Sequence, residues 1–268
     1  MRNGAVSTLM VAASGLVAGA LSVWLVGAPM KAGAMGRDSV TTHGEWVKFA
    51  NAAGDSVRAY VAYPERKDKA PAVIVIHEIF GLTDWEPTVA DKLAGQGYVA
   101  VVPDLLSSRF GMSPASGDSG RKLVAQLSPD GVNADLDAAY AYLNTLPAVK
   151  KDHIGTIGFC WGGARSFRYA TANPKLKAAV ICYGSAPDSA LMPNIKAKLL
   201  GVYGEEDARI NAALPDVTRQ LKQAKVKSSY DIYPGTGHGF LKPGRKGSDG
   251  PAVEQAWARI LEFYKKSL

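Results

Sequence analysis

Short apolar runs alternate with helical patterns along most of the chain. The runs predict buried strands at Ala72–Ile76, Tyr98–Val102, Ile154–Phe159, Ala178–Tyr183, Lys198–Tyr203 and Ser228–Tyr233. Continuous rather than alternating apolar runs are typical of strands covered on both faces. The stretches between them predict helices near Thr88–Gly95, Val132–Leu146, Gly163–Thr171, Asn211–Lys225 and Pro251–Lys266. This alternation indicates an α/β fold, with right-handed crossovers, a mostly parallel central sheet and helices on both faces.

Two shorter strand-like runs precede this pattern. Trp46–Phe49 and Ser56–Tyr63 flank the turn-forming residues 51–55. They predict an antiparallel N-terminal hairpin at one edge of the sheet.

Residues 1–34 differ from the rest of the chain. They hold an apolar run from Ala5 to Val26, two basic residues, no acidic residue and the sequence Ala-Gly-Ala at 32–34. This arrangement predicts a secretory signal cleaved before Met35, and hence export to the periplasm or the medium. The length of the run leaves a membrane anchor through residues 5–26 as an alternative. Residues 35–268 are expected to form one domain.

Composition and charge narrow the functional classes. With 47% hydrophobic and 21% charged residues, the chain is neither collagen-like nor disordered. The formal net charge is +7, but basic and acidic residues alternate, so no nucleic-acid partner is expected. A basic surface does favour an anionic small substrate. The four histidines are scattered and no C-x-x-C occurs, so neither a metal nor a cofactor is expected.

The residues after three predicted strands carry the candidate chemistry. Gly158-Phe-Cys160-Trp-Gly162 has the form of a G-x-S-x-G nucleophile elbow with Cys in place of Ser. Asp207 follows the strand at 198–203, and His238 follows the strand at 228–233. Nucleophile, acid and base thus occur in the chain order of an α/β-hydrolase triad. Taken singly, Asp207 could be a helix-cap carboxylate and His238 a loop histidine.

A fourth loop follows the strand at 72–76 and contains His77, Glu78 and Ile79. In this fold such a loop supplies one oxyanion-hole amide, so we expect the amides of Ile79 and Trp161 to form that hole. Glu78 would then lie beside the nucleophile and accept a hydrogen bond from its thiol. His77 is expected to be a packed residue at the strand end.

Together these segments resemble the dienelactone hydrolase family over about residues 45–266. The matching pieces are residues 77–81, Val-Pro-Asp-Leu at 102–105, residues 158–163, Gly-Glu-Glu-Asp at 204–207 and Gly-His-Gly-Phe at 237–240. The resemblance implies a monomeric α/β-hydrolase that opens a lactone or small ester through a Cys-His-Asp triad, without a cofactor or an obligate protein partner. It also implies that Glu78 takes part in activating Cys160.

The resemblance further implies cationic side chains that bind a substrate carboxylate. One lies shortly after the histidine, where this sequence has Lys242, which keeps the charge but lacks the arginine fork. For the other, Arg121 is the nearest candidate and Arg109 the second. Phe240 is expected to contact substrate.

Two alternatives remain open from the sequence. The chain could be an exported general carboxylesterase. It could also be a non-catalytic exported domain in which Cys160 and Cys182 form a disulfide.

Overall fold

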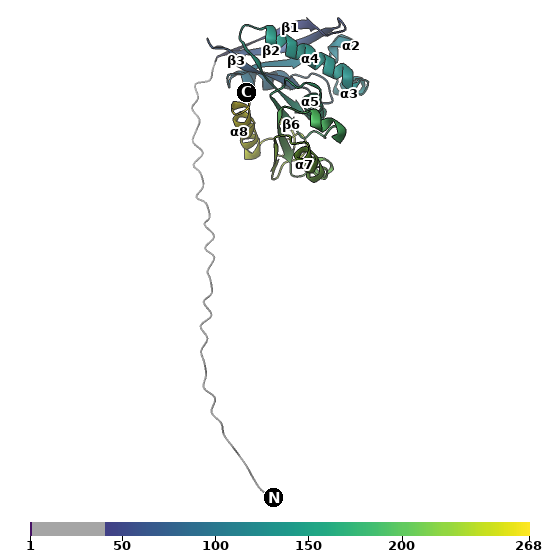
Figure 1. Cartoon of the computed structure of the whole chain (residues 1–268). Helices are drawn as coiled ribbons and strands as arrows, with labels where there is room; N and C mark the ends of the chain where they lie inside the picture. Colours follow the sequence, from purple (N-terminus) through teal and green to yellow (C-terminus); the bar gives the residue numbers. More distant parts are fainter. Residues whose placement is uncertain (2–40) are drawn as a thin grey trace. The chain divides into compact units, whose positions relative to one another are not determined.

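The computed structural model of the chain describes Met1 and residues 41–268 (Figure 1). Apart from Met1, the predicted signal at residues 1–34 lies outside the described residues. The same holds for the alternative anchor at residues 5–26. Within residues 41–268, no helix is both long enough and apolar enough to span a membrane.

Eight strands form one mixed sheet in the order β1-β2-β4-β3-β5-β6-β7-β8. Only β1, β2 and β4 pair in antiparallel fashion, and the remaining neighbours are parallel. The strands are β1 Thr42–Ala50, β2 Ser56–Pro64, β3 Ala70–Ile76, β4 Val99–Pro103, β5 Val149–Phe159, β6 Ala178–Cys182, β7 Lys198–Gly204 and β8 Ser228–Tyr233. The predicted N-terminal hairpin and parallel sheet are therefore confirmed.

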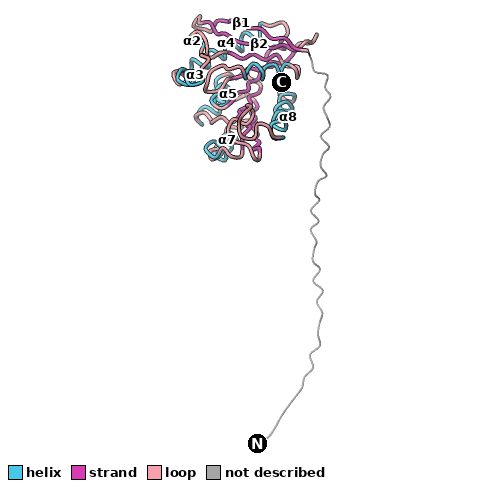
Figure 2. Tube along the Cα trace, turned by 180° about the vertical axis from the view of Figure 1, so that it is seen from behind, coloured by secondary structure: helices cyan, strands magenta, loops and turns pink. Residues whose placement is uncertain are grey.

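Helices cover both faces of this sheet (Figure 2). One hydrophobic core joins the sheet to α1 and α8, and a second core on the other face joins it to α4, α5 and α7. The helices are α1 Trp85–Ala94, α2 Ser107–Phe110, α3 Gly117–Val124, α4 Pro129–Thr145, α5 Trp161–Ala172, α6 Ala208–Asn211, α7 Leu214–Gln223 and α8 Pro251–Lys265, with a 3₁₀ turn, η1, at Ser189–Asn194. This architecture is the α/β-hydrolase fold that the sequence predicts.

The structure departs from the sequence pattern at several elements. The short helices α2, α3 and α6 and the turn η1 were not expected, because none carries a long apolar periodicity. The strand β5 begins at Val149 rather than Ile154. The strand β8 is the sheet edge, so residues 228–230 are exposed rather than covered on both faces.

Candidate active site

Cys160 occupies a strained turn between β5 and α5. Its φ is 55°, a left-handed conformation that a residue with a side chain rarely adopts. A Cβ atom on Gly158 would lie 1.9 Å from the carbonyl oxygen of Gly162, so the turn closes only with glycine at position 158. The amide of Cys160 donates to the carbonyl of Cys182 at 3.0 Å, and the Cys160 residue is half-buried. This is the geometry of a nucleophile elbow, with strain stored at the reactive position.

Asp207 and His238 form a close pair at the same edge of the sheet. The Nδ1 atom of His238 lies 2.5 Å from Oδ2 of Asp207, whose side chain is only 6% exposed. Asp207 immediately precedes α6, yet its side chain makes no capping hydrogen bond to that helix. The carboxylate therefore orients the imidazole, and the helix-cap alternative for Asp207 is wrong.

The imidazole of His238 also meets the sulfur of Cys160. The pKa of His238 is raised to about 9, chiefly by its hydrogen bond with the Cys160 side chain; burial opposes the rise, and Asp207 adds to it. The loops after β5, β7 and β8 thus bring Cys160, Asp207 and His238 together. Such convergence at the carboxyl ends of parallel strands is where chemistry is placed in open α/β sheets.

Glu78 lies buried in the loop after β3, with 3% of its side chain exposed. Its Oε2 accepts a hydrogen bond from Nζ of Lys242 at 3.1 Å. The expected hydrogen bond from the Cys160 thiol to Glu78 is not present among the described residues; Lys242 takes that place. A buried carboxylate gains more from a nearby ammonium group than from a neutral thiol, which accounts for the difference.

The two predicted oxyanion-hole residues lie on adjoining segments. A Cβ atom on Gly162 would lie 2.3 Å from the carbonyl oxygen of His77, so the loop after β3 presses directly against the elbow. His77 is fully buried and stacks on Trp161 at 5.4 Å, which confirms it as a packed residue. Within residues 41–268, neither the Ile79 amide nor the Trp161 amide donates to a protein acceptor. Both N–H groups are therefore free to bind another oxygen.

Two of the predicted substrate-binding cations gather at Phe80. The guanidinium of Arg121, on α3, lies 5.3 Å from the centre of the Phe80 ring, and Nζ of Lys242 lies 5.8 Å from it. A Cβ atom on Gly120 would lie 1.9 Å from the carbonyl oxygen of Phe80. The helix α3 therefore packs on the loop that carries Glu78 and Ile79, and it brings Arg121 to the site.

The other two predicted substrate-binding residues lie elsewhere. Arg109 donates to the carbonyl of Gln126 at 3.0 Å and lines a separate cavity beside Asp135. Phe240 has no exposed surface and packs at 6.1 Å from Tyr183, in the core behind His238. Phe240, two residues after His238, thus faces the core, which the motif alone does not reveal.

Both cysteines are free thiols, so the alternative of a Cys160–Cys182 disulfide is wrong for this structure. Cys182 is fully buried, and burial raises the pKa of its thiol, with a smaller contribution from Glu78. Cys182 is thereby kept protonated and inert, whereas Cys160 is accessible.

Two features of the site were missed from the sequence. Tyr183 has a φ of 42° and packs edge-on against the His238 ring at 5.1 Å. The buried Asp104 accepts hydrogen bonds from the amide and hydroxyl of Ser113, and the Ser113 hydroxyl in turn accepts one from the amide of Leu82. This network fixes the end of the Glu78 loop. Its only sequence signal was the Val-Pro-Asp-Leu motif, to which no role had been given.

Comparison with known proteins identifies the family to which the chain belongs. A sequence model of the "Dienelactone hydrolase family" matches residues 57–268. The chain is 34% identical over 231 residues to a Synechocystis protein named "Putative carboxymethylenebutenolidase", covering 79% of this chain and 92% of that protein. A Salmonella typhimurium protein of the same name is 36% identical over 230 residues, covering 79% and 83% of the two chains. A crystal structure described as a "Putative Dienelactone Hydrolase" from Klebsiella pneumoniae superposes with a TM-score of 0.75 at 27% identity, covering 84% of this chain and 99% of that chain. The chain therefore belongs to the dienelactone hydrolase family.

Proposed function

We propose that this protein hydrolyses a lactone or a small carboxylic ester through Cys160, His238 and Asp207, with a thioester intermediate. The proposal is carried by the His238 imidazole, whose Nδ1 lies 2.5 Å from Asp207 and which hydrogen-bonds the side chain of Cys160 on the strained elbow. The relatives named as carboxymethylenebutenolidases support the same substrate class.

In the first half of the reaction, His238 accepts the proton of the Cys160 thiol, and the resulting thiolate attacks the carbonyl carbon. The α5 helix begins at Trp161, so its positive N-terminal end lies beside the sulfur and favours the thiolate. The amides of Ile79 and Trp161 hold the oxyanion. As the tetrahedral intermediate collapses, His238 gives its proton to the leaving oxygen, the ring or ester C–O bond breaks, and a thioester remains.

In the second half, His238 removes a proton from a water molecule that attacks the thioester carbonyl. The second tetrahedral intermediate expels Cys160 as a thiolate and releases the carboxylate product. Asp207 stabilises the imidazolium in both halves and keeps the same tautomer throughout.

Glu78 and Lys242 set the charge beside the nucleophile. Because Lys242 neutralises Glu78, the site is not left with an uncompensated carboxylate next to the developing oxyanion. We propose that Glu78 acts through this pair rather than through a hydrogen bond from the resting thiol.

The substrate is proposed to be anionic, with Arg121 as its principal anchor. Arg121 is exposed, lies over Phe80, and has no carboxylate within ion-pair distance among residues 41–268. In Arg121→Ala the KM for an anionic lactone should rise while kcat is nearly kept, and a neutral aryl ester should be unaffected. Arg109→Ala is the matched control, because it also removes a guanidinium group, but one that lies away from Phe80, beside Asp135. Equal turnover of anionic and neutral substrates by the unaltered enzyme would favour the general carboxylesterase alternative instead.

The decisive variant for the mechanism is Cys160→Ala, with Cys182→Ala as its control. Hydrolysis of a dienelactone and of p-nitrophenyl acetate should fall on the order of 10⁴-fold or more in the first variant and stay near normal in the second. Acid quenching of the unaltered enzyme should trap an acyl group on the peptide that contains Cys160, as measured by mass spectrometry. Undiminished turnover in Cys160→Ala would refute the mechanism.

We also propose that residues 1–34 direct export and that the mature protein is a monomer. The support is the composition of that segment, with Arg2 before the apolar run and Ala-Gly-Ala at its end. N-terminal sequencing of the protein from a periplasmic fraction should give Met35, whereas an intact N-terminus in the membrane fraction would indicate an anchor. Sedimentation of the mature form would test the monomer.

A further inference from the structure

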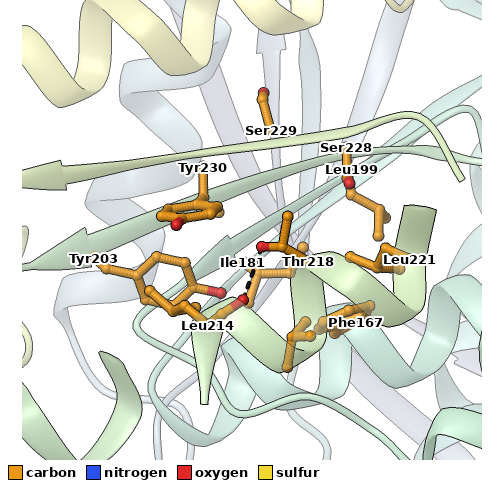
Figure 3. Close-up of a pocket in the computed structure, with 12 residues that line it drawn as sticks. Phe167, Ile181, Leu199, Tyr203, Leu214, Thr218, Leu221, Ser228, Ser229 and Tyr230 are labelled. Carbon is orange, nitrogen blue, oxygen red and sulfur yellow. Dashed lines mark hydrogen bonds between the residues drawn. The ribbon is translucent and has the colours of Figure 1, made fainter. Parts of the chain in front are cut away.

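An apolar cavity lies beneath α7, away from the nucleophile. It has a volume of about 250 Å³, and its apolar wall comes from Phe167, Ile181, Leu199, Leu214 and Leu221. Figure 3 shows Tyr203 and Tyr230 on one side of this space, with Leu199, Leu221 and Phe167 on the other. An apolar cavity of about 150 Å³ is enough to hold benzene, so this one can accept a somewhat larger group.

The cavity continues toward the acid loop of the active site. An adjoining cavity of about 80 Å³ shares Phe167, Tyr203, Leu214 and Val217 with the first. Its remaining wall includes Gly184, Ile210 and Arg209, the last two on α6 directly after Asp207. The two adjoining cavities together extend from the beginning of β8 to α6. We call them together the α7 tract.

A cation without a partner stands at the α6 end of the α7 tract. Arg209 is exposed, and within residues 41–268 no carboxylate lies within ion-pair distance of its guanidinium. The three acidic residues just before it in sequence are engaged: Asp207 meets His238, Glu206 pairs with Lys246, and Glu205 accepts the amide of Gly235. The α7 tract therefore combines an apolar interior with a free positive charge at its mouth.

Gly201, in the middle of β7, belongs to the wall of the larger cavity. A Cβ atom there would lie 2.4 Å from the ring of Tyr203 and 2.8 Å from Cβ of Tyr230. Any larger residue would displace the two aromatic side chains that bound the space. A glycine inside a central strand normally weakens it, and one recognised reason for its presence is close approach of a ligand or another segment.

We propose that the α7 tract is a second binding site, for a carboxylate that carries an apolar tail of medium length. The tail lies under α7 and the carboxylate meets Arg209. A mostly apolar wall with one placed polar group is the general form of a small-molecule site. None of the catalytic side chains lines the tract, so the site is distinct from the active centre and does not depend on the proposed mechanism.

The test is isothermal titration of the full chain with octanoate, octanol and acetate. Octanoate should bind, octanol should bind about two- to fivefold more weakly because it lacks the charge, and acetate should show no heat because it lacks the tail. Arg209→Gln should reduce octanoate affinity to that of octanol, and Arg209→Lys should restore most of it. Lys222→Gln, on the exposed side of α7, is the matched control and should bind octanoate normally.

Val217→Phe places a larger side chain where the two cavities meet. It should weaken octanoate binding at least about tenfold while hydrolysis of p-nitrophenyl acetate stays unchanged. Circular dichroism establishes that this variant is folded; if it is not, the Arg209 pair of variants still decides. Three results would overturn the proposal: no binding of octanoate to the unaltered chain, equal affinity in Val217→Phe, or octanoate inhibition of hydrolysis that is competitive with an inhibition constant equal to its dissociation constant. Equal affinity for octanoate and octanol would overturn the role of Arg209.

Discussion

Replacing Lys242 by Met isolates the buried ion pair of the active site. The change keeps the length of the side chain and its packing near Phe80 and Trp85 but removes the charge 3.1 Å from Glu78. With 3% of its side chain exposed, Glu78 would be left as an uncompensated buried carboxylate. Removing one partner of a fully buried ion pair lowers the free energy of unfolding by about 3–5 kcal/mol.

The cost here should be somewhat lower. Lys242 keeps 18% of its side chain exposed, so water screens part of the attraction. We therefore expect the free energy of unfolding at pH 7 to fall by about 2–4 kcal/mol, as measured by urea denaturation followed by circular dichroism.

Lys246→Met is the matched control, because it also removes a lysine ion pair from the loop after His238. The Lys246–Glu206 pair is exposed, at 62% and 47% of the two side chains, so its loss should cost no more than about 1 kcal/mol. Adding Glu78→Gln to Lys242→Met should restore most of the lost stability, since it removes the orphaned charge. The reasoning is refuted if Lys242→Met is as stable as Lys246→Met, or if the double variant is less stable than Lys242→Met alone.

Three further results should follow from the same structure. Because the pKa of His238 is raised from 6.5 to about 9, the folded protein binds the imidazole proton more tightly than the unfolded chain does. The free energy of unfolding should therefore fall as the pH rises from about 6.5 to about 9. His238→Gln should remove this dependence on pH, as measured by urea denaturation at several pH values. Since the Cys160 side chain is the first cause of the shift, Cys160→Ala should lower the pKa of His238, as read from the imidazole proton resonances; an unchanged value would place the cause elsewhere. Ser113→Ala removes the hydroxyl hydrogen bond to the buried Asp104 carboxylate and the acceptor of the Leu82 amide, while the Ser113 amide still donates to Asp104. The variant should therefore lower the free energy of unfolding by about 1–3 kcal/mol; a melting temperature equal to that of the unaltered protein would contradict this.

The three loops of the candidate site could be placed from the sequence because each follows a predicted buried strand. In a parallel sheet the carboxyl ends of the strands share one edge. Once the strands were located, this geometry predicted that Cys160, Asp207 and His238 lie near one another. The glycines at 158 and 162 gave a second, independent constraint, since a side chain at either position would collide with the turn. Local chain geometry is therefore sufficient to predict where residues of this kind lie.

The partners of long side chains could not be predicted in this way. Glu78 and Lys242 lie 164 positions apart in the chain, and their pairing depends on how two loops pack rather than on either motif. Arg109 and Arg121 are equally basic in the sequence, but only Arg121 lies on α3, a helix of 8 residues that contains two glycines. Its contact with Phe80 is a tertiary one, made possible because Gly120 has no side chain to hold the helix away.

The position of Lys242 reconciles its pairing with its expected role in binding substrate. An ammonium group has three donors, and among residues 41–268 Lys242 uses one of them on Glu78 while its Nζ lies 5.0 Å from the Trp85 ring centre. An arginine fork engaged with Glu78 would be fixed in one plane, whereas an ammonium on a flexible stem can turn toward a second acceptor without leaving the first. An incoming carboxylate would then share Lys242 with Glu78 and so weaken that bond, while Arg121, near the same Phe80 ring, supplies a second cation. Binding of an anionic substrate would in that case loosen Glu78 next to Cys160, which couples recognition of the anion to the charge at the nucleophile.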